Sequence, residues 1–167
     1  CKTCNNLGCT SCYDGYYKSK FLNYCYKCSI LCKTCMSTSR NCTSCNDTVK
    51  VASGDIMVNA NQKVCMPNAF NGNVTMNGGQ LVICGTATIN NFNFNSGDIV
   101  VNGNATFSNV NMNNASSAIR NYGTVKFSNI TFNGRFENHG QATVLSDFNV
   151  NSNAEFINTG VLNATMS

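Results

Sequence analysis

The C-terminal two thirds of the chain repeat one short phrase at a nearly fixed interval. The stretch FSNVNMN at 107–113 returns as FSNITFN at 127–133. Glycines recur with it, at spacings of 18, 20, 17 and 20 residues: Gly85, Gly103, Gly123, Gly140 and Gly160. A unit of this length cannot enclose a core alone, so successive units must stack and share one.

Aligning the units on these glycines produces three apolar columns, in which every second residue is apolar. The first column follows each glycine and holds Ala87, Ala105, Val125 and Ala142, then Ile89, Phe107, Phe127 and Val144. The second lies in the repeated phrase and holds Phe92, Val110, Ile130 and Phe148, then Phe94, Met112, Phe132 and Val150. The third precedes the next glycine and holds Leu81, Ile99, Ile119, Phe136 and Phe156. Alternation of this kind is typical of half-buried strands, so we predict a parallel β-helix with three short strands in each rung.

This β-helix is expected to span residues 53–167, in about five rungs of 17–20 residues, because SGDIMVN at 53–59 matches SGDIVVN at 96–102. Asparagine is abundant and falls into columns of its own: Asn95, Asn113, Asn133 and Asn151, and also Asn121, Asn138 and Asn158. At about 4.8 Å per rung, such side chains can form amide ladders. Arg120 and Glu137 share a column on neighbouring rungs and are expected to pair. Length variation is confined to one turn, which therefore lies outside the stack.

The N-terminal segment, residues 1–52, is a small cysteine-rich domain. Eleven of the twelve cysteines precede residue 66, and CKTC followed by CTSC occurs twice, which indicates an internal duplication. The paired CxxC spacing would permit zinc sites. The number of cysteines and the crowding of Cys28, Cys32 and Cys35 favour disulfides without a metal, and hence an oxidising, extracellular compartment.

The stretches YDGYYKSKFLNYCYKC and CSILCKTCMSTSRNCTSC resemble the furin-like, growth-factor-receptor type of cysteine-rich repeat, over about residues 1–66. The resemblance implies these disulfides: Cys1 with Cys9, Cys12 with Cys25, Cys28 with Cys35, Cys32 with Cys42, and Cys45 with Cys65. It also implies a partner for Cys4 upstream of Cys1, in a longer polypeptide. Cys84 lies outside the pattern, and a Cys65–Cys84 bond is the alternative, because the two are about one rung apart.

The β-helical part is similar to pectate lyases, phage tailspikes and bacterial surface adhesins, which raises the hypothesis of a carbohydrate-active enzyme. Such enzymes need clustered carboxylates. The acidic residues of the repeats are Asp55, Asp98, Glu137, Asp147 and Glu155, and no two share a column on adjacent rungs. Asp98 and Glu155 share a column three rungs apart, and His139 is expected in a turn. We therefore predict no enzymatic activity, no catalytic residue and no cofactor.

The distribution of charge, the length of apolar runs and the glycosylation sequons indicate which partners the chain can have. Residues 1–63 carry eight Lys or Arg and three acidic residues, scattered rather than clustered with aromatics, which does not suit nucleic acid. No apolar run is long enough to span a membrane. Sequons for N-linked glycans occur at seven positions: Asn41, Asn46, Asn73, Asn104, Asn114, Asn129 and Asn163.

The leading hypothesis is an extracellular structural glycoprotein at a cell surface, which assembles head to tail with itself or continues as a longer chain. The alternatives are an adhesin or ligand-binding receptor ectodomain and, less favoured, a polysaccharide-cleaving enzyme. Exposure of the aromatic side chains at 13–26 would favour the ligand-binding alternative. We expect them to pack into the core of the cysteine-rich domain instead.

Overall fold

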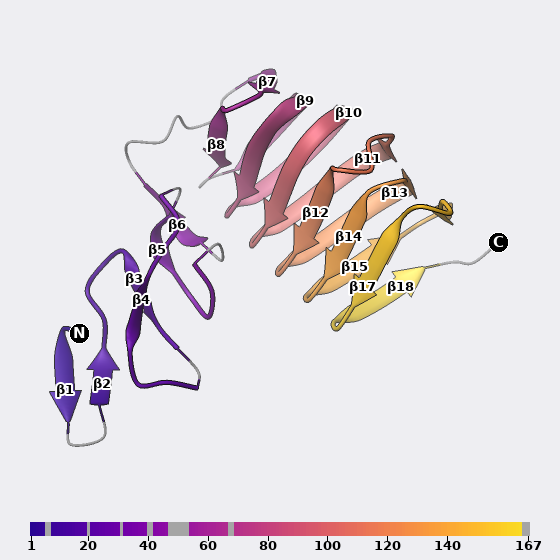
Figure 1. The fold of residues 1–167 in the computed structure, drawn as a ribbon. Helices are drawn as coiled ribbons and strands as arrows, with labels where there is room; N and C mark the ends of the chain where they lie inside the picture. Colours follow the sequence, from indigo (N-terminus) through magenta and orange to yellow (C-terminus); the bar gives the residue numbers. More distant parts are fainter. Residues whose placement is uncertain are drawn as a thin grey trace. The chain divides into compact units, whose positions relative to one another are not determined.

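The computed structural model describes residues 1–5, 8–19, 21–30, 32–39, 42–46, 54–66 and 69–164. These residues form β-strands and no helix. The chain divides into two compact units, 1–50 and 51–167, which we describe separately (Figure 1). The boundary expected between residues 52 and 53 lies outside the described residues.

The N-terminal unit consists of three antiparallel hairpins. Their strands are β1 (Thr3–Asn5) with β2 (Gly8–Ser11), β3 (Tyr16–Lys18) with β4 (Cys25–Lys27), and β5 (Cys32–Cys35) with β6 (Cys42–Cys45). The buried apolar side chains among its described residues are all cysteines: Cys9, Cys28, Cys32, Cys35, Cys42 and Cys45. Sulfur therefore supplies the interior that a segment this small cannot build from larger apolar residues.

The C-terminal unit is a parallel β-solenoid of about six turns, which confirms the predicted fold class (Figure 1). Its strands are β7 (Ile56–Asn59), β8 (Lys63–Met66), β9 (Phe70–Ile83), β10 (Thr86–Val101), β11 (Asn104–Met112), β12 (Ala118–Asn121), β13 (Thr124–Phe132), β14 (Arg135–Asn138), β15 (Gln141–Val144), β16 (Phe148–Val150), β17 (Glu155–Asn158) and β18 (Val161–Ala164). Each strand segment pairs in parallel with its equivalent one turn away.

The pairing register reproduces the columns read from the sequence. Ala87 pairs with Ala105, and Ala105 with Val125; on another side of the rung, Ile99 pairs with Ile119, and Ile119 with Phe136. One detail differs from the expectation. In β9 and β10 the strand pairing continues around the corners, so those rungs are not divided into three short strands.

The matching phrases SGDIMVN and SGDIVVN also occupy different sides of the rung. The first contributes β7, which pairs with Val74–Gly78 of β9, whereas the second contributes Asp98–Val101, which pairs with Gln80–Ile83. The same apolar alternation suits either side, because both present alternate residues to the shared core. Local sequence similarity therefore did not define the position of this strand within the rung.

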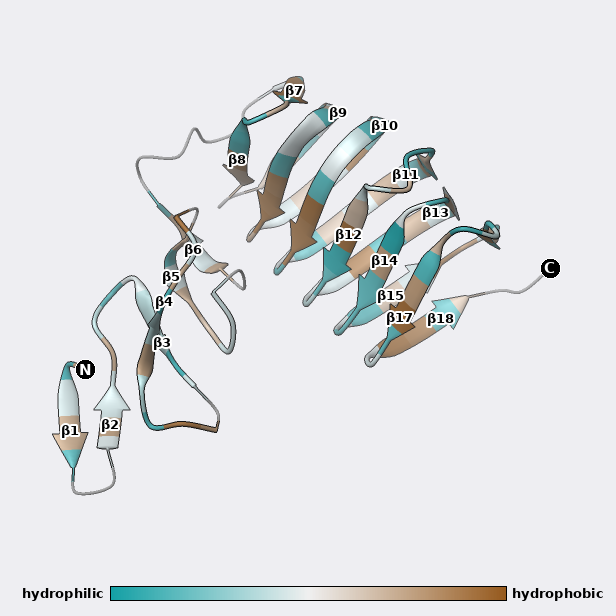
Figure 2. Ribbon diagram, viewed as in Figure 1, coloured by the Kyte–Doolittle hydropathy of each residue, from teal (hydrophilic) through white to brown (hydrophobic). Residues whose placement is uncertain are grey.

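Stacked side chains fill the interior, and Figure 2 shows apolar positions repeating from rung to rung. Phe107 and Phe127, on neighbouring rungs, stack with ring centroids 5.5 Å apart, while Phe132 meets Phe136 edge to face at 5.9 Å within one rung. All four rings are fully buried. Such ring pairs contribute about 0.5–1.5 kcal/mol beyond the area they bury, so aromatic stacking reinforces the register between rungs.

One corner of the solenoid is a column of glycines in close backbone contact. A Cβ atom built on Gly103, Gly123, Gly140 or Gly160 would collide with the carbonyl oxygen of the glycine one rung earlier. Only glycine permits so close an approach of two backbones. The glycine interval that revealed the repeat in the sequence is thus a steric requirement of stacking.

Asparagine ladders join the rungs. Asn121 Nδ2 donates to Asn138 Oδ1, and Asn138 Nδ2 donates to Asn158 Oδ1, both at 2.8 Å; Asn121 and Asn138 are fully buried. In the other predicted column, Asn151 Nδ2 donates to Asn133 Oδ1 at 2.6 Å. Repeated amides thus satisfy one another along the stack, as the sequence predicted.

Candidate functional site

The cysteines of the N-terminal unit form disulfides, with the partners that the furin-like resemblance implies. The bonds join Cys1 to Cys9, Cys12 to Cys25, Cys28 to Cys35, and Cys32 to Cys42. Their Cα–Cα distances, 4.9–5.7 Å, lie in the ordinary range. The sulfur atoms of Cys1, Cys9 and Cys25 lie within 4.8 Å of one another, but all three are oxidised and cannot act as thiolate ligands.

Cys45 and Cys65 are also disulfide-bonded, while Cys84 carries a thiol, so the alternative Cys65–Cys84 bond is not formed. Burial raises the pKa of the Cys84 thiol and outweighs the opposing hydrogen bond with Asn102. Cys84 is therefore protonated and weakly nucleophilic at neutral pH.

Cys4 is exposed, with Sγ 3.0 Å from Sγ of Cys1. Ten oxidised cysteines in a chain of this size are typical of an oxidising, extracellular environment.

Five of the six aromatic side chains between β2 and the end of β4 are exposed, and the sixth, Tyr17, is half-buried, so our expectation that they pack into the core was wrong. The exposed fraction is 95% for Phe21, 69% for Tyr24 and 58% for Tyr13. Buried cysteines occupy the interior, which leaves these larger rings outside. We call residues 13–26 the aromatic hairpin. An exposed aromatic surface of this kind is typical of interaction sites.

The sequons differ in accessibility. Asn104, Asn114 and Asn163 are exposed, Asn46, Asn73 and Asn129 are half-buried, and Asn41 lies outside the described residues. Asn73 is held in a ladder, where its Nδ2 donates to Asp55 and its Oδ1 accepts from Asn91. Asn114 instead lies in a fully exposed turn, where its Oδ1 accepts hydrogen bonds from the backbone N–H and the hydroxyl of Ser116, at 2.9 and 2.8 Å.

We expect Asn114 to be the most completely glycosylated of the described sequons, because its turn presents both the amide and the Ser116 hydroxyl to solvent. Secretion from a eukaryotic host, followed by intact mass measurement, checks this. Asn114→Gln should remove the mass of one glycan, whereas Asn129→Gln, in the middle of β13, should leave the mass distribution almost unchanged. Full occupancy at Asn129 with none at Asn114 would contradict the prediction.

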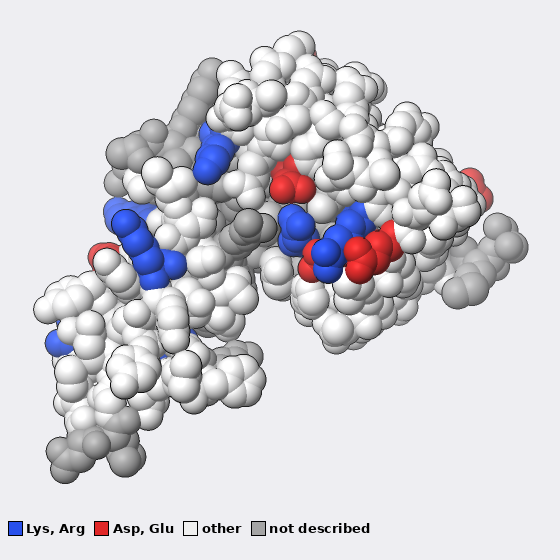
Figure 3. All heavy atoms as spheres, viewed as in Figure 1, with Lys and Arg blue, Asp and Glu red and all other residues white. Residues whose placement is uncertain are grey.

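Charged side chains gather on the outer face of β10, β12, β14 and β17 (Figure 3). Arg120 Nε lies 3.0 Å from Glu137 Oε1, which is the pair predicted from the sequence columns. Arg135 Nε lies 2.8 Å from the same oxygen and 3.4 Å from Glu155, and Arg120 Nη1 lies 3.7 Å from Asp98. We call these five residues the ion-pair network.

Column reasoning alone missed most of this network. Asp98 and Glu155 share a column, as predicted, with Ala118 and Arg135 between them. Glu137 belongs to the neighbouring column, but residues i and i+2 of a strand face the same side, so Arg135 also reaches Glu137. The alternation Arg135-Phe136-Glu137 was the available signal.

His139 lies in a turn, as predicted, and extends the network. Its Nε2 is 3.3 Å from Glu137 Oε2, its Nδ1 is 2.7 Å from Thr159 Oγ1, and its ring stacks on Tyr122 at 5.0 Å. A hydroxyl, an imidazole and a carboxylate in series resemble a hydrolytic triad. The backbone N–H groups of Thr159 and Gly160 both donate to Asn138 O, however, so neither can stabilise an oxyanion.

The ion-pair network makes the stability depend on pH. Burial alone would raise the pKa of Glu137, but the hydrogen bond with His139 and the charges of Arg120 and Arg135 hold it below its usual value. A depressed pKa in the folded state adds stability that is complete above the ordinary Glu pKa and is lost as the pH falls through the folded value.

We expect Glu137→Gln to lower the free energy of unfolding by about 2 kcal/mol at pH 7, because two guanidinium groups lose their shared carboxylate. The same variant should flatten the decline in stability below the ordinary Glu pKa. Urea denaturation between pH 3 and 7 measures both effects. Glu155→Gln is the matched control, since that side chain is mostly exposed and should change stability by under about 0.5 kcal/mol. Equal losses from the two variants would contradict the prediction.

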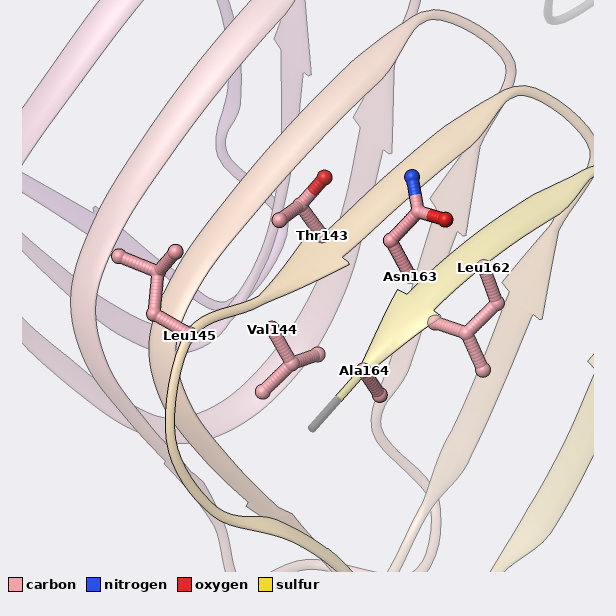
Figure 4. A pocket seen from close by; sticks show the side chains of 6 residues that line it. All are labelled: Thr143, Val144, Leu145, Leu162, Asn163 and Ala164. Carbon is pink, nitrogen blue, oxygen red and sulfur yellow. The ribbon is translucent and has the colours of Figure 1, made fainter. Parts of the chain in front are cut away.

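The last rung is less covered than the rungs before it. Ala142 and Val144 of β15 are buried, whereas Leu162 and Ala164, their partners in β18, are half-buried. A pocket of about 440 Å³ opens here, lined by Thr143, Val144, Leu145, Leu162, Asn163 and Ala164 (Figure 4). Within the described part of the chain, the outer edge of β18 pairs with no strand.

These features define a β-solenoid protein with a disulfide-rich N-terminal unit. Comparison of the chain with protein-family models, with curated proteins and with solved structures finds no match. Across the described ranges, no helix is long and apolar enough to cross a membrane.

Proposed function

We propose that the chain is a segment of an extracellular structural glycoprotein whose β-solenoid stacks end to end, with a further copy or with a continuation of the same polypeptide. The observation that supports this proposal is the exposed edge of the last rung. Among the described residues its outer strand edge is unpaired, and such an edge is a template for another strand. Its apolar residues, Leu162 and Phe156, pack against the core but remain half-buried.

The geometry of such a contact favours a linear assembly. The first and last rungs present different surfaces, so contact between them is heterologous and propagates into a filament unless the rotation closes a ring. Ladders and ring stacks that already join the rungs would then continue across the contact. The disulfide-rich unit, with its resemblance to furin-like repeats, fits a cell-surface or secreted setting. A glycan on Asn114 would project from an exposed turn on the side of the stack.

Sedimentation velocity and electron microscopy of the full chain test the proposal. We expect concentration-dependent linear assemblies. Leu162→Lys places a charge in the open end and should abolish them, whereas Thr88→Lys adds the same charge to the exposed side of β10 and should not. Monomers at every concentration, or assemblies that survive Leu162→Lys, would refute stacking through this end.

The exposed aromatic hairpin favours a second candidate function, a ligand-binding ectodomain or adhesin. Amide hydrogen exchange of residues 13–26 in assembled and monomeric protein separates the two uses. Protection that appears only on assembly would assign the aromatic hairpin to the contact between copies. Exchange that stays fast in the assembly would leave its rings open to a different partner, as the second candidate requires.

A further inference from the structure

A polar pocket of about 380 Å³ lies over the ion-pair network, on the outer side of the solenoid. Its lining includes Asp98, Ser116, Arg120, Arg135, Asn153 and Glu155, which come from β10, β12, β14, β17 and the turns before them. The pocket spans several rungs along the side of the stack, from Asp98 in β10 to Glu155 in β17, which belongs to the last rung.

The polar groups in this pocket are held in fixed positions. Glu137 accepts contacts from both arginines, and Arg135 also reaches Glu155, so the planar groups constrain one another. Side chains that are fixed before binding lose little conformational entropy when a ligand arrives. The pocket is thus pre-organised for hydrogen bonding.

Hydrogen-bonding capacity remains unused inside it. Ser117 is fully buried, and neither its Oγ nor Nη1 of Arg120 has a hydrogen-bond partner. Arg120 Nη1 lies 3.7 Å from Asp98 Oδ1, which is too long for a direct hydrogen bond. A hydroxyl group between them could accept from the guanidinium and donate to the carboxylate.

The charge of the site selects the kind of ligand. Three carboxylates, of Asp98, Glu137 and Glu155, against two guanidinium groups leave one net negative charge, which disfavours a phosphate, a sulfate or a uronic acid. Alternating acceptors and donors suit groups that both donate and accept, which is the property of a hydroxyl.

We propose that this pocket binds a neutral oligosaccharide, through hydroxyl groups bridging Asp98 and Arg120 and through contacts with Asn153 and Glu155. The site binds sugar without cleaving it, and it does not depend on end-to-end assembly.

Isothermal titration of the full chain with four probes, cellohexaose, maltohexaose, mannohexaose and chitohexaose, tests the proposal. We expect at least one to bind with a Kd of about 10⁻⁴–10⁻³ M, and an anionic oligogalacturonate to bind at least tenfold more weakly. Asp98→Asn keeps the side-chain volume, removes a charged acceptor and should weaken binding at least tenfold. Asn153→Ala, at an exposed position in the same pocket, should also weaken it.

Asp147→Asn is the matched control, because Asp147 is exposed and lies outside the pocket, and binding should not change. An unchanged far-UV circular dichroism spectrum shows that each variant is folded. The proposal is overturned if none of the four probes binds, if oligogalacturonate binds best, or if folded Asp98→Asn and Asn153→Ala variants bind as tightly as the original chain.

Discussion

Replacing Gly123 by alanine is expected to destabilise the β-solenoid by about 4 kcal/mol or more, which is exceptional for the addition of one methyl group. The added Cβ would collide with the carbonyl oxygen of Gly103 and would also press on the backbone of Asn102. These are backbone atoms in a hydrogen-bonded stack, so they cannot rotate away as a side chain would. Urea denaturation followed by far-UV circular dichroism measures the loss.

Gly54→Ala is the informative control for this variant. Gly54 has φ of +71° but nothing within 4 Å of the position of a Cβ, so only backbone strain opposes the substitution. A left-handed conformation costs a non-glycine residue about 1–2 kcal/mol. If Gly123→Ala lost no more stability than Gly54→Ala, close approach would not be the reason for the glycine column.

The second large effect is expected for Asn138→Ala, which should lower the free energy of unfolding by about 3 kcal/mol. Asn138 is fully buried, accepts from Asn121, and donates to Asn158 Oδ1 and to Val161 O at 2.8 and 2.9 Å. Alanine would leave these groups without a hydrogen-bond partner. Water could replace the lost amide only by disturbing the packed interior, which also lowers stability. Equilibrium denaturation gives the magnitude.

Asn151→Ala tests whether burial or ladder membership sets that cost. Asn151 Nδ2 also donates to an asparagine one rung away, Asn133, but its side chain is exposed and water can replace the bond. We expect a loss of under about 0.5 kcal/mol. Similar losses for the two variants would mean that the amide ladder, rather than the burial of Asn138, dominates.

Much of the solenoid was predictable because equivalent positions of successive rungs carry the same type of residue. Glycine recurs where backbones touch, and Ile99, Ile119 and Phe136 recur where side chains meet across rungs. The first turn was harder to place, since residues 54–66 lack the repeated phrase. With this turn the solenoid has about six turns, whereas the columns predicted about five rungs. Period-two alternation shows that a strand has a buried face, but not which side of the rung it occupies.

The surface was less predictable than the core. The Arg120–Glu137 pair followed from a column, whereas the links from Arg135 and from Asp98 depend on how long side chains extend across a face. Exposure of Phe21 and Tyr24 depends on how much volume the disulfides leave inside the small unit. Neither quantity is encoded in a local pattern of residue types.

The constant register of the rungs makes a whole rung the natural unit of insertion and deletion. Removing residues 103–122 would join Asn102 to Gly123 and bring Val125 and Phe127 over Ala87 and Ile89, in columns that already accept such residues. Removing one residue from the middle of β13 would instead turn every following side chain of that strand to the opposite face. Genes for such a chain can therefore lengthen or shorten it in steps of 17–20 codons while the core, the ladders and the glycine corner keep their form.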